Sequence, residues 1–107
     1  MKIKVATIFP EMFSALEIGL LGKARQNGLI DLQVVNIRDY SKDKHKKTDD
    51  APFGGGAGMV MTPQPLHDAI NHLDSEHKAK RIYMSPKGKT LNQEIVERLA
   101  KEDELLL

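Results

Sequence analysis

The segment from residue 38 to residue 62 (RDYSKDKHKKTDDAPFGGGAGMVMT) carries the side chains that could hold a phosphorylated ligand. Its first half is dense in lysine and aspartate. Its second half places Gly54, Gly55, Gly56 and Gly58 just before the apolar Met59. Glycine allows positive φ and close approach of the main chain to a ligand. A loop this long in a compact domain is usually functional or disordered. Because apolar residues follow the glycines at once, we interpret it as an ordered substrate-binding loop, with a flexible linker as the alternative.

The charges of this segment have a chemistry of their own. Five cations are offset by four aspartates: Arg38, Lys42, Lys44, Lys46 and Lys47 against Asp39, Asp43, Asp49 and Asp50. Beside a glycine loop, such a cluster favours phosphate positioning next to a base pocket; the alternative is a solvated charged face. The whole chain has a net charge of only +1, so any contact with nucleic acid must be local.

Two nucleotide motifs can be tested by their spacing, and both fail. A dinucleotide fold would place glycines directly after the first strand, where this chain has Phe9-Pro10-Glu11. Gly88-Lys89-Thr90 resembles the end of a phosphate-binding loop, but the first glycine of that motif would fall at Tyr83.

A metal site is not expected. His67, His72 and His77 are five residues apart, about 140° per step on a helix, so they cannot share a face. His45 lies among lysines, a setting that disfavours a divalent cation. The pair Asp49-Asp50 leaves two roles open, a metal ligand or an acceptor of hydrogen bonds from a base or from the loop.

The elements that must position these residues alternate between strand and helix. Apolar and β-branched runs predict strands over residues 2–9, 29–37 and 81–84, and a last strand beginning at Glu104. Between them we expect a helix from Pro10 to Asn27-Gly28, with Phe13, Leu16, Leu20 and Ala24 on one stripe. A second helix starts at Thr62-Pro63, and a third follows a capping box of Thr90 and Gln93. The pattern predicts an α/β fold, a mostly parallel sheet flanked by helices.

The short segment Ser85-Pro86-Lys87-Gly88 follows the third predicted strand. Open α/β sheets bind their ligands at the carboxyl ends of strands, so this corner is a candidate binding element. The alternative is a turn that only links strand to helix.

The 107 residues form a single domain or part of one. There is no cysteine, which suits an intracellular protein, and no signal peptide or membrane-spanning run is recognisable. The sequence stops at Leu105-Leu106-Leu107, the opening of an apolar strand. We therefore expect residues 1–107 to be the N-terminal portion of a longer protein.

Five spaced blocks resemble the bacterial tRNA (guanine-N1)-methyltransferases of the TrmD type, over the whole length of the chain. They are Ile8-Phe9-Pro10-Glu11-Met12-Phe13, Asn27-Gly28-Leu29, Asn36-Ile37-Arg38-Asp39-Tyr40, His45 to Met59 with its Asp49-Asp50-x-Pro52-Phe53-Gly54-Gly55-Gly56-x-Gly58 core, and Tyr83-Met84-Ser85-Pro86-x-Gly88. The resemblance implies methyl transfer from S-adenosylmethionine to N1 of the guanine at position 37 of tRNA. It also implies a cytoplasmic homodimer with an α/β-knot (SPOUT-type) fold, whose knot is missing from these residues.

The resemblance further implies roles for particular residues. The methyl donor would be bound by Tyr83, Met84, Ser85, Pro86 and Gly88. Substrate RNA would be bound by Arg38, His45, Asp49, Asp50, Gly54, Gly55, Gly56, Gly58 and Met59. The catalytic base is expected beyond Leu107, so no catalytic residue is assigned here, and the 107 residues alone are expected to be inactive.

Two other functions stay open on sequence. The basic loop could make the chain a non-enzymatic RNA- or phosphate-binding module, and the bare last strand could pair with another chain as an assembly element.

Overall fold

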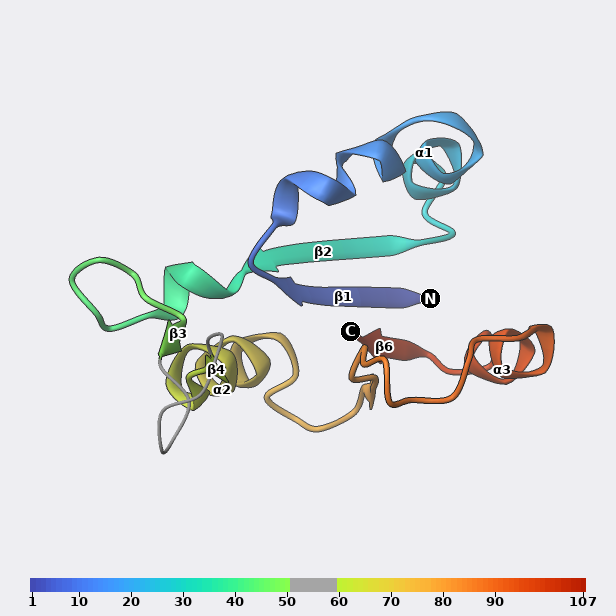
Figure 1. The fold of residues 1–107 in the computed structure, drawn as a ribbon. Coiled ribbons are helices and arrows are strands. Elements are labelled where there is room, and N and C mark those ends of the chain that lie inside the picture. Colours follow the sequence, from blue (N-terminus) through green and yellow to red (C-terminus); the bar gives the residue numbers. More distant parts are fainter. Residues whose placement is uncertain (51–59) are drawn as a thin grey trace.

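A four-stranded parallel sheet forms the centre of the computed structural model, which describes residues 1–50 and 60–107 (Figure 1). Its strands are β1 (Lys2–Thr7), β2 (Asp31–Asn36), β5 (Lys80–Arg81) and β6 (Glu104–Leu106), in the order β2-β1-β6-β5. All three strand pairs are parallel, with Val5 opposite Val34 and Ile3 opposite Leu105. The predicted α/β fold with a mostly parallel sheet is confirmed.

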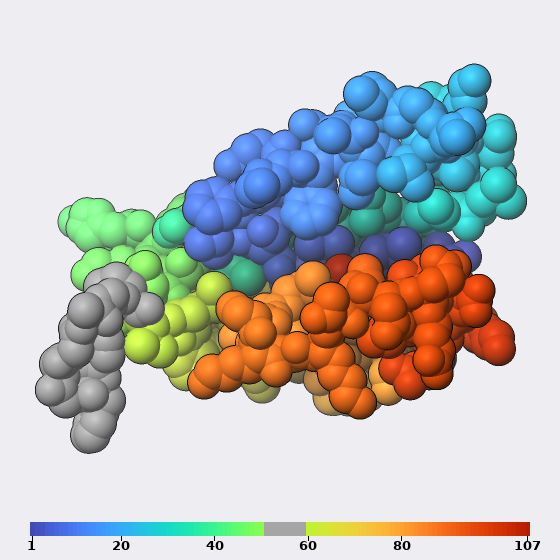
Figure 2. All heavy atoms as spheres, turned by 45° about the vertical axis from the view of Figure 1, so that its right-hand side comes forward, coloured from blue at the N-terminus to red at the C-terminus, as the bar shows by residue number. Residues whose placement is uncertain are grey.

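Helical elements cover both faces of this sheet, as parallel strands require. Ile3 and Val5 of β1 point toward η1 (Pro10–Glu17) and α1 (Gly19–Gln26). Lys4 and Ala6, which alternate with them, point toward α2 (Pro63–Leu73). In Figure 2 the N-terminal helices and the segment after α2 lie on opposite sides of the molecule, with side chains of β1 visible between them.

The core is small and lies where α2 meets the central strands. Within the described residues, the buried apolar side chains come from three places: the sheet, the start of η2 (Ile37–Tyr40) and α2. They are Val5, Leu105, Leu106, Ile37, Ala69 and Leu73. The leucine run at the end of the chain is therefore a buried strand, as predicted.

The helix expected from Pro10 to Asn27 is interrupted, and that prediction is wrong. A 3-10 segment, η1, ends at Glu17; the next residue, Ile18, is extended (φ −116°, ψ 166°), and Gly19 follows with φ +67°. The break lets Phe13 and Leu16 face the sheet while Leu20 is left 85% exposed. The predicted end is confirmed, since Gly28 has φ +76° and donates to the carbonyl of Arg25.

Two further local predictions need correction. The third strand is shorter than expected and displaced, Lys80–Arg81 in place of 81–84. The helix α3 (Gln93–Leu99) is not capped by Thr90 and Gln93. Asn92 is its N-cap, and its Oδ1 accepts from the main-chain nitrogen of Ile95 at 2.9 Å. Asparagine caps helices as well as threonine or better, so the residue adjacent to the helix took the role.

In the described part of the chain, no helix has the length and apolar character needed to cross a membrane.

Candidate active site

An apolar cleft of about 350 Å³ opens at the carboxyl ends of the strands. One wall comes from α2 and the other from the residues that leave β5, with the ends of β1 and β6 as the floor. Its lining consists of Ala6, Ile37, Met61, Leu66, Ile70, Arg81, Ile82, Tyr83, Met84, Leu106 and Leu107. Its size and apolar character suit a small molecule or a cofactor.

The strand order explains why the cleft forms here. From β1 the chain proceeds to β2 on one side and later returns to β5 and β6 on the other. The connections therefore diverge between β1 and β6, and a crevice is left at that point. Open α/β sheets bind ligands at such a topological switch point.

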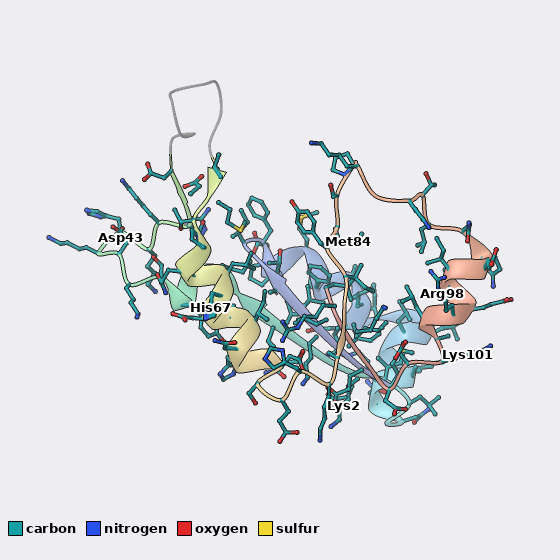
Figure 3. The ribbon with its side chains drawn as sticks, turned by 90° about the horizontal axis from the view of Figure 1, so that it is seen from below. Lys2, Asp43, His67, Met84, Arg98 and Lys101 are labelled. Carbon is teal, nitrogen blue, oxygen red and sulfur yellow. The ribbon has the colours of Figure 1, made fainter. Side chains whose placement is uncertain are left out.

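Tyr83 and Met84 stand on the rim of the cleft with little cover. Their exposed fractions are 88% and 69%, and Figure 3 shows Met84 on the irregular segment that leaves the sheet. Ile82 makes the last main-chain bond to β6, donating to Leu106 at 2.8 Å. Within the described residues, the main-chain groups of Tyr83 and Met84 have no hydrogen-bond partner. They are available to a ligand.

The corner that follows is a turn. The main-chain nitrogen of Gly88 donates to the carbonyl of Ser85 at 3.1 Å, and that of Lys87 donates to Ser85 Oγ at 3.2 Å. Ser85, Pro86 and Gly88 adjoin Met84 in the chain but do not line the cleft.

The two ends of the glycine loop are joined by a short antiparallel ladder, which the sequence did not suggest. β3 (Asp49–Asp50) pairs with β4 (Val60–Met61), so that Asp49 lies opposite Met61 and Asp50 opposite Val60. The main-chain carbonyl of Thr48, a buried residue, accepts from the main-chain nitrogen of Thr62 at 2.7 Å. Met61 lines the cleft, so the ladder brings the acidic pair beside it. Gly54, Gly55, Gly56, Gly58 and Met59 lie outside the described residues.

The charged half of the segment, residues 38–48, is ordered by its own polar side chains. Ser41 Oγ donates to the carbonyl of Lys47 at 2.6 Å, and Asp43 Oδ2 accepts from the main chain of His45 at 2.8 Å. This bond from His45 holds the pKa of Asp43 below its ordinary value of 3.8. Lys42, Lys44, Lys46 and Lys47 are exposed. The segment therefore presents its cations on a folded loop.

Gln64 of α2 ties this basic loop to the cleft wall, a role that sequence reasoning missed. Its Nε2 donates to the carbonyl of Tyr40 at 2.6 Å, and its Oε1 accepts from the main chain of Lys42 at 3.2 Å. Arg38 is half-buried and directly follows Ile37, which lines the cleft, whereas His45 is exposed on the loop. A glutamine at the second position of a helix is too common in sequences to identify such a contact.

The three histidines in and after α2 do not form a cluster. His67, His72 and His77 are all exposed; His72 lies beside Tyr40, with ring centroids 5.7 Å apart. Among the residues that the structure describes, no three acidic or histidine side chains are placed to hold a metal ion.

A buried carboxylate lies at the end of α2. Asp74, 3% exposed, accepts from the main chain of Lys78 at 2.9 Å and of Ala79 at 3.2 Å through Oδ1, and from Arg81 Nε at 3.0 Å through Oδ2. Burial raises its pKa. The hydrogen bonds from Ala79, Arg81 and Lys78 outweigh burial, and the pKa is lowered from 3.8.

This carboxylate should make stability depend on pH. Because the pKa is lower in the folded state, ionised Asp74 stabilises the fold above about pH 4, and the contribution disappears as the pH falls through the folded value. We expect Asp74→Asn to cost roughly 1–2 kcal/mol at pH 7, a modest figure because Arg81 is partly exposed and solvent screens the pair. Urea unfolding of both proteins at pH 7, 5 and 3 measures this. A gap that stays constant down to pH 3 would contradict it.

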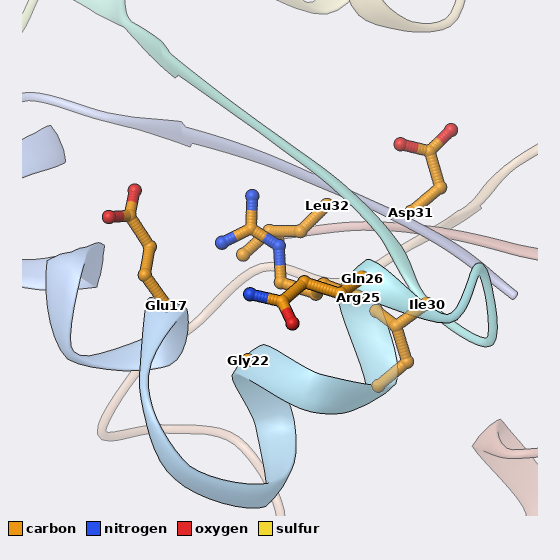
Figure 4. A pocket seen from close by; sticks show the side chains of 7 residues that line it. All are labelled: Glu17, Gly22, Arg25, Gln26, Ile30, Asp31 and Leu32. Carbon is orange, nitrogen blue, oxygen red and sulfur yellow. The ribbon is translucent and has the colours of Figure 1, made fainter.

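A second hollow, of about 370 Å³, lies on the other face of the sheet, between η1, α1 and β2 (Figure 4). Arg25 and Gln26 reach into it from α1, and Glu17 borders it from η1. Its polar groups carry both signs of charge, and none of the residues from the sequence motifs lines it.

Fold and site together define a class: an α/β domain with an apolar cleft at the switch point of a parallel sheet, next to a basic loop. The family model described as tRNA (Guanine-1)-methyltransferase TrmD matches residues 1–107. The chain belongs to this family. A tRNA (guanine-N(1)-)-methyltransferase of Clostridium perfringens is 54% identical over 106 residues, and one of Clostridium acetobutylicum is 50% identical over 107. The matches cover 99% and 100% of this chain but 45% and 44% of the relatives.

A solved structure agrees with the fold. The crystal structure of tRNA (m1G37) methyltransferase from Aquifex aeolicus matches with a TM-score of 0.87 at 29% identity. The match covers 99% of this chain and 49% of that one. The chain thus spans slightly less than half the length of the relatives that it matches.

Proposed function

We propose that residues 1–107 form the N-terminal portion of an enzyme that transfers a methyl group from S-adenosylmethionine to N1 of the guanine at position 37 of tRNA. The observation that carries this is the juxtaposition of Met61, at the end of the glycine loop, with Tyr83 and Met84 in one cleft. Membership of the family supplies the reaction, since the relatives bear the name tRNA (guanine-N(1)-)-methyltransferase.

The residues of the cleft fit such a donor. Its apolar walls, with Leu66, Ile70 and Ile82, suit the faces of an adenine ring, and the free main-chain groups of Tyr83 and Met84 suit its polar edge. The donor supplies an electrophilic methyl group on a sulfonium. Tyr83 and Met84 bind it, with Ser85, Pro86 and Gly88 shaping the corner behind them.

The RNA side of the proposal rests on the basic loop. Its exposed lysines hold phosphates, Arg38 and His45 assist, and the acidic pair Asp49 and Asp50 with the glycines to Met59 receive the target guanine. Alignment of two reactants is a large part of catalysis in such a transfer. Guanine N1 must also lose its proton, and a base is required for that step. We assign the base to a part of the protein beyond Leu107, together with the knot.

The proposal includes a homodimer in the cytoplasm, in which the site is completed between subunits. Several apolar side chains of the N-terminal helical region stand open for such a contact: Met12, Ile18, Leu20 and Leu29 are at least 67% exposed. Large exposed apolar areas mark interaction surfaces.

Methyl incorporation tests the proposal. The full-length protein that carries this chain should transfer labelled methyl from S-adenosylmethionine to tRNA with guanine at position 37, and should leave tRNA with adenine at that position unlabelled. The 107-residue chain alone should be inactive. A full-length protein that ignores tRNA, or that labels both tRNAs equally, would refute the assignment.

Removing the loop cations should weaken tRNA binding through salt-dependent contacts. We expect the triple change Lys44→Ala, Lys46→Ala and Lys47→Ala to reduce the slope of log K against log salt by roughly 2, since each phosphate contact contributes about 0.7–0.9. Filter binding at 50–200 mM salt measures the slope.

Lys101→Ala is the matched control for this prediction. Lys101 is also exposed, but it lies at the far end of the molecule from the basic loop, as its distance from Asp43 in Figure 3 shows. Equal slopes for the triple variant and the wild type would show that the basic loop does not contact the RNA phosphates.

A further inference from the structure

The cleft has two walls that belong to different elements, and its width depends on what joins them. Leu66 and Ile70 belong to α2, whereas Ile82, Tyr83 and Met84 belong to the segment that leaves β5. The two-residue strand β5 offers few ladder bonds to hold that segment, and Tyr83 and Met84 are mostly exposed. Packing alone therefore does little to fix the second wall.

One polar group joins the walls directly. The guanidinium of Arg81 donates through Nε to Asp74 Oδ2 at 3.0 Å and through Nη2 to the Asp74 carbonyl at 3.3 Å. Nη2 also lies 2.8 Å from His77 Nδ1. Asp74 directly follows α2, and Arg81 is the last residue of β5 and itself lines the cleft. The α2 side is fixed independently, because Lys4 Nζ donates to the carbonyl of Leu73 at 2.6 Å and pairs with Glu104 of β6 at 3.4 Å.

We propose that Asp74 and Arg81 form a clamp that sets the width of the methyl-donor cleft, with Asp74 as a positioning residue that acts through Arg81. The clamp deepens the proposed function and rests on it. Two bonds of a planar guanidinium to one residue fix orientation as well as distance. When the clamp is loosened, the Tyr83–Met84 wall can move against α2. Binding of the methyl donor then weakens, whereas the steps of the reaction that follow binding change less.

Asp74→Asn isolates the clamp from the fold of the loop. The asparagine Oδ1 keeps both main-chain bonds, from Lys78 and Ala79, whereas its Nδ2 replaces the acceptor of Arg81 Nε by a donor. Glu76→Gln is the matched control. This substitution removes the ion pair between Glu76 and Lys78 in the same loop. The side chains of Glu76 and Lys78 are both 69% exposed, and neither contacts Arg81.

The test measures steady-state methyl transfer and calorimetric binding of S-adenosylmethionine by the full-length protein. We expect Asp74→Asn to raise Kd and KM for S-adenosylmethionine about tenfold, with kcat and KM for tRNA changed less than about twofold. In an Arg81→Gln background, Asp74→Asn should add less than about twofold, because the partner is already lost. Glu76→Gln should match the wild type.

Each other outcome is decisive. An Asp74→Asn protein with a lower unfolding temperature and unchanged affinity for S-adenosylmethionine would reduce Asp74 to a structural role and overturn the clamp, while the proposed function stands. If Asp74→Asn does not fold, Arg81→Lys decides by the same measurements, since it keeps a cation but loses the two-bond geometry. A wild-type protein that binds no S-adenosylmethionine would overturn both proposals.

Discussion

The substitution Gly22→Ala is expected to destabilise the fold by about 3 kcal/mol, although alanine has a higher helix propensity than glycine. Gly22 is buried in α1, and a Cβ there would lie 2.2 Å from the main-chain oxygen of Glu17 and 2.6 Å from its carbonyl carbon. Both atoms are backbone, so η1 and α1 would have to separate. On propensity alone the change would stabilise a helix by about 1 kcal/mol. The sign of the effect in urea unfolding therefore tests the packing directly.

Gly88→Ala provides the comparison. Its Cβ would meet the carbonyl oxygen of Ser85 at 3.3 Å, a contact that a small shift relieves, so we expect less than about 1 kcal/mol. A Gly22→Ala protein as stable as the wild type would show that η1 and α1 are not in contact at this point.

Truncation of Leu106 should cost a similar amount and also damage the cleft. Leu106 is 3% exposed in β6, between Lys4 of β1 and Arg81 of β5, and it forms part of the cleft floor. Leu→Ala changes at buried sites cost about 2–5 kcal/mol, because apolar burial is lost and a cavity remains. We expect about 3 kcal/mol in chemical unfolding, with weaker binding of S-adenosylmethionine in calorimetry.

Leu91→Ala is the control for Leu106. Leu91 is 64% exposed, so its loss should change stability by less than about 0.5 kcal/mol. Equal effects of the two substitutions would mean that β6 is not an inner strand of the sheet.

Runs of apolar residues predicted the strands, and their alternation with helical patterns predicted the parallel arrangement. The β-branched stretch at Lys2–Thr7 and the terminal leucines formed strands as predicted, because a strand buried on both faces requires a continuous apolar run. The end of the first helical region at Gly28 and the start of α2 at Pro63 were also confirmed. These features depend on φ restrictions of single residues, which the sequence displays directly.

The candidate site was only partly visible in the sequence. Tyr83 and Met84 belong to a motif that the sequence displays, and the structure brings them together with Met61. Leu66 and Ile70, which form the opposite wall, looked like ordinary residues of a helical stripe. The break at Ile18–Gly19 was missed for a related reason, since Phe13, Leu16 and Leu20 satisfy helical spacing whether or not the helix is continuous.

By itself, the sequence determined the order and type of the elements, the parallel α/β fold and the family, because these depend on local spacing and on short motifs. The tertiary structure decided which side chains share the cleft, that Asp74 is buried and bound to Arg81, and that Gly22 touches Glu17. Such contacts join distant positions: Lys4 meets the carbonyl of Leu73, 69 residues away, and Glu104, 100 residues away. Burial and ion pairing depend on packing between elements, and no local pattern encodes them.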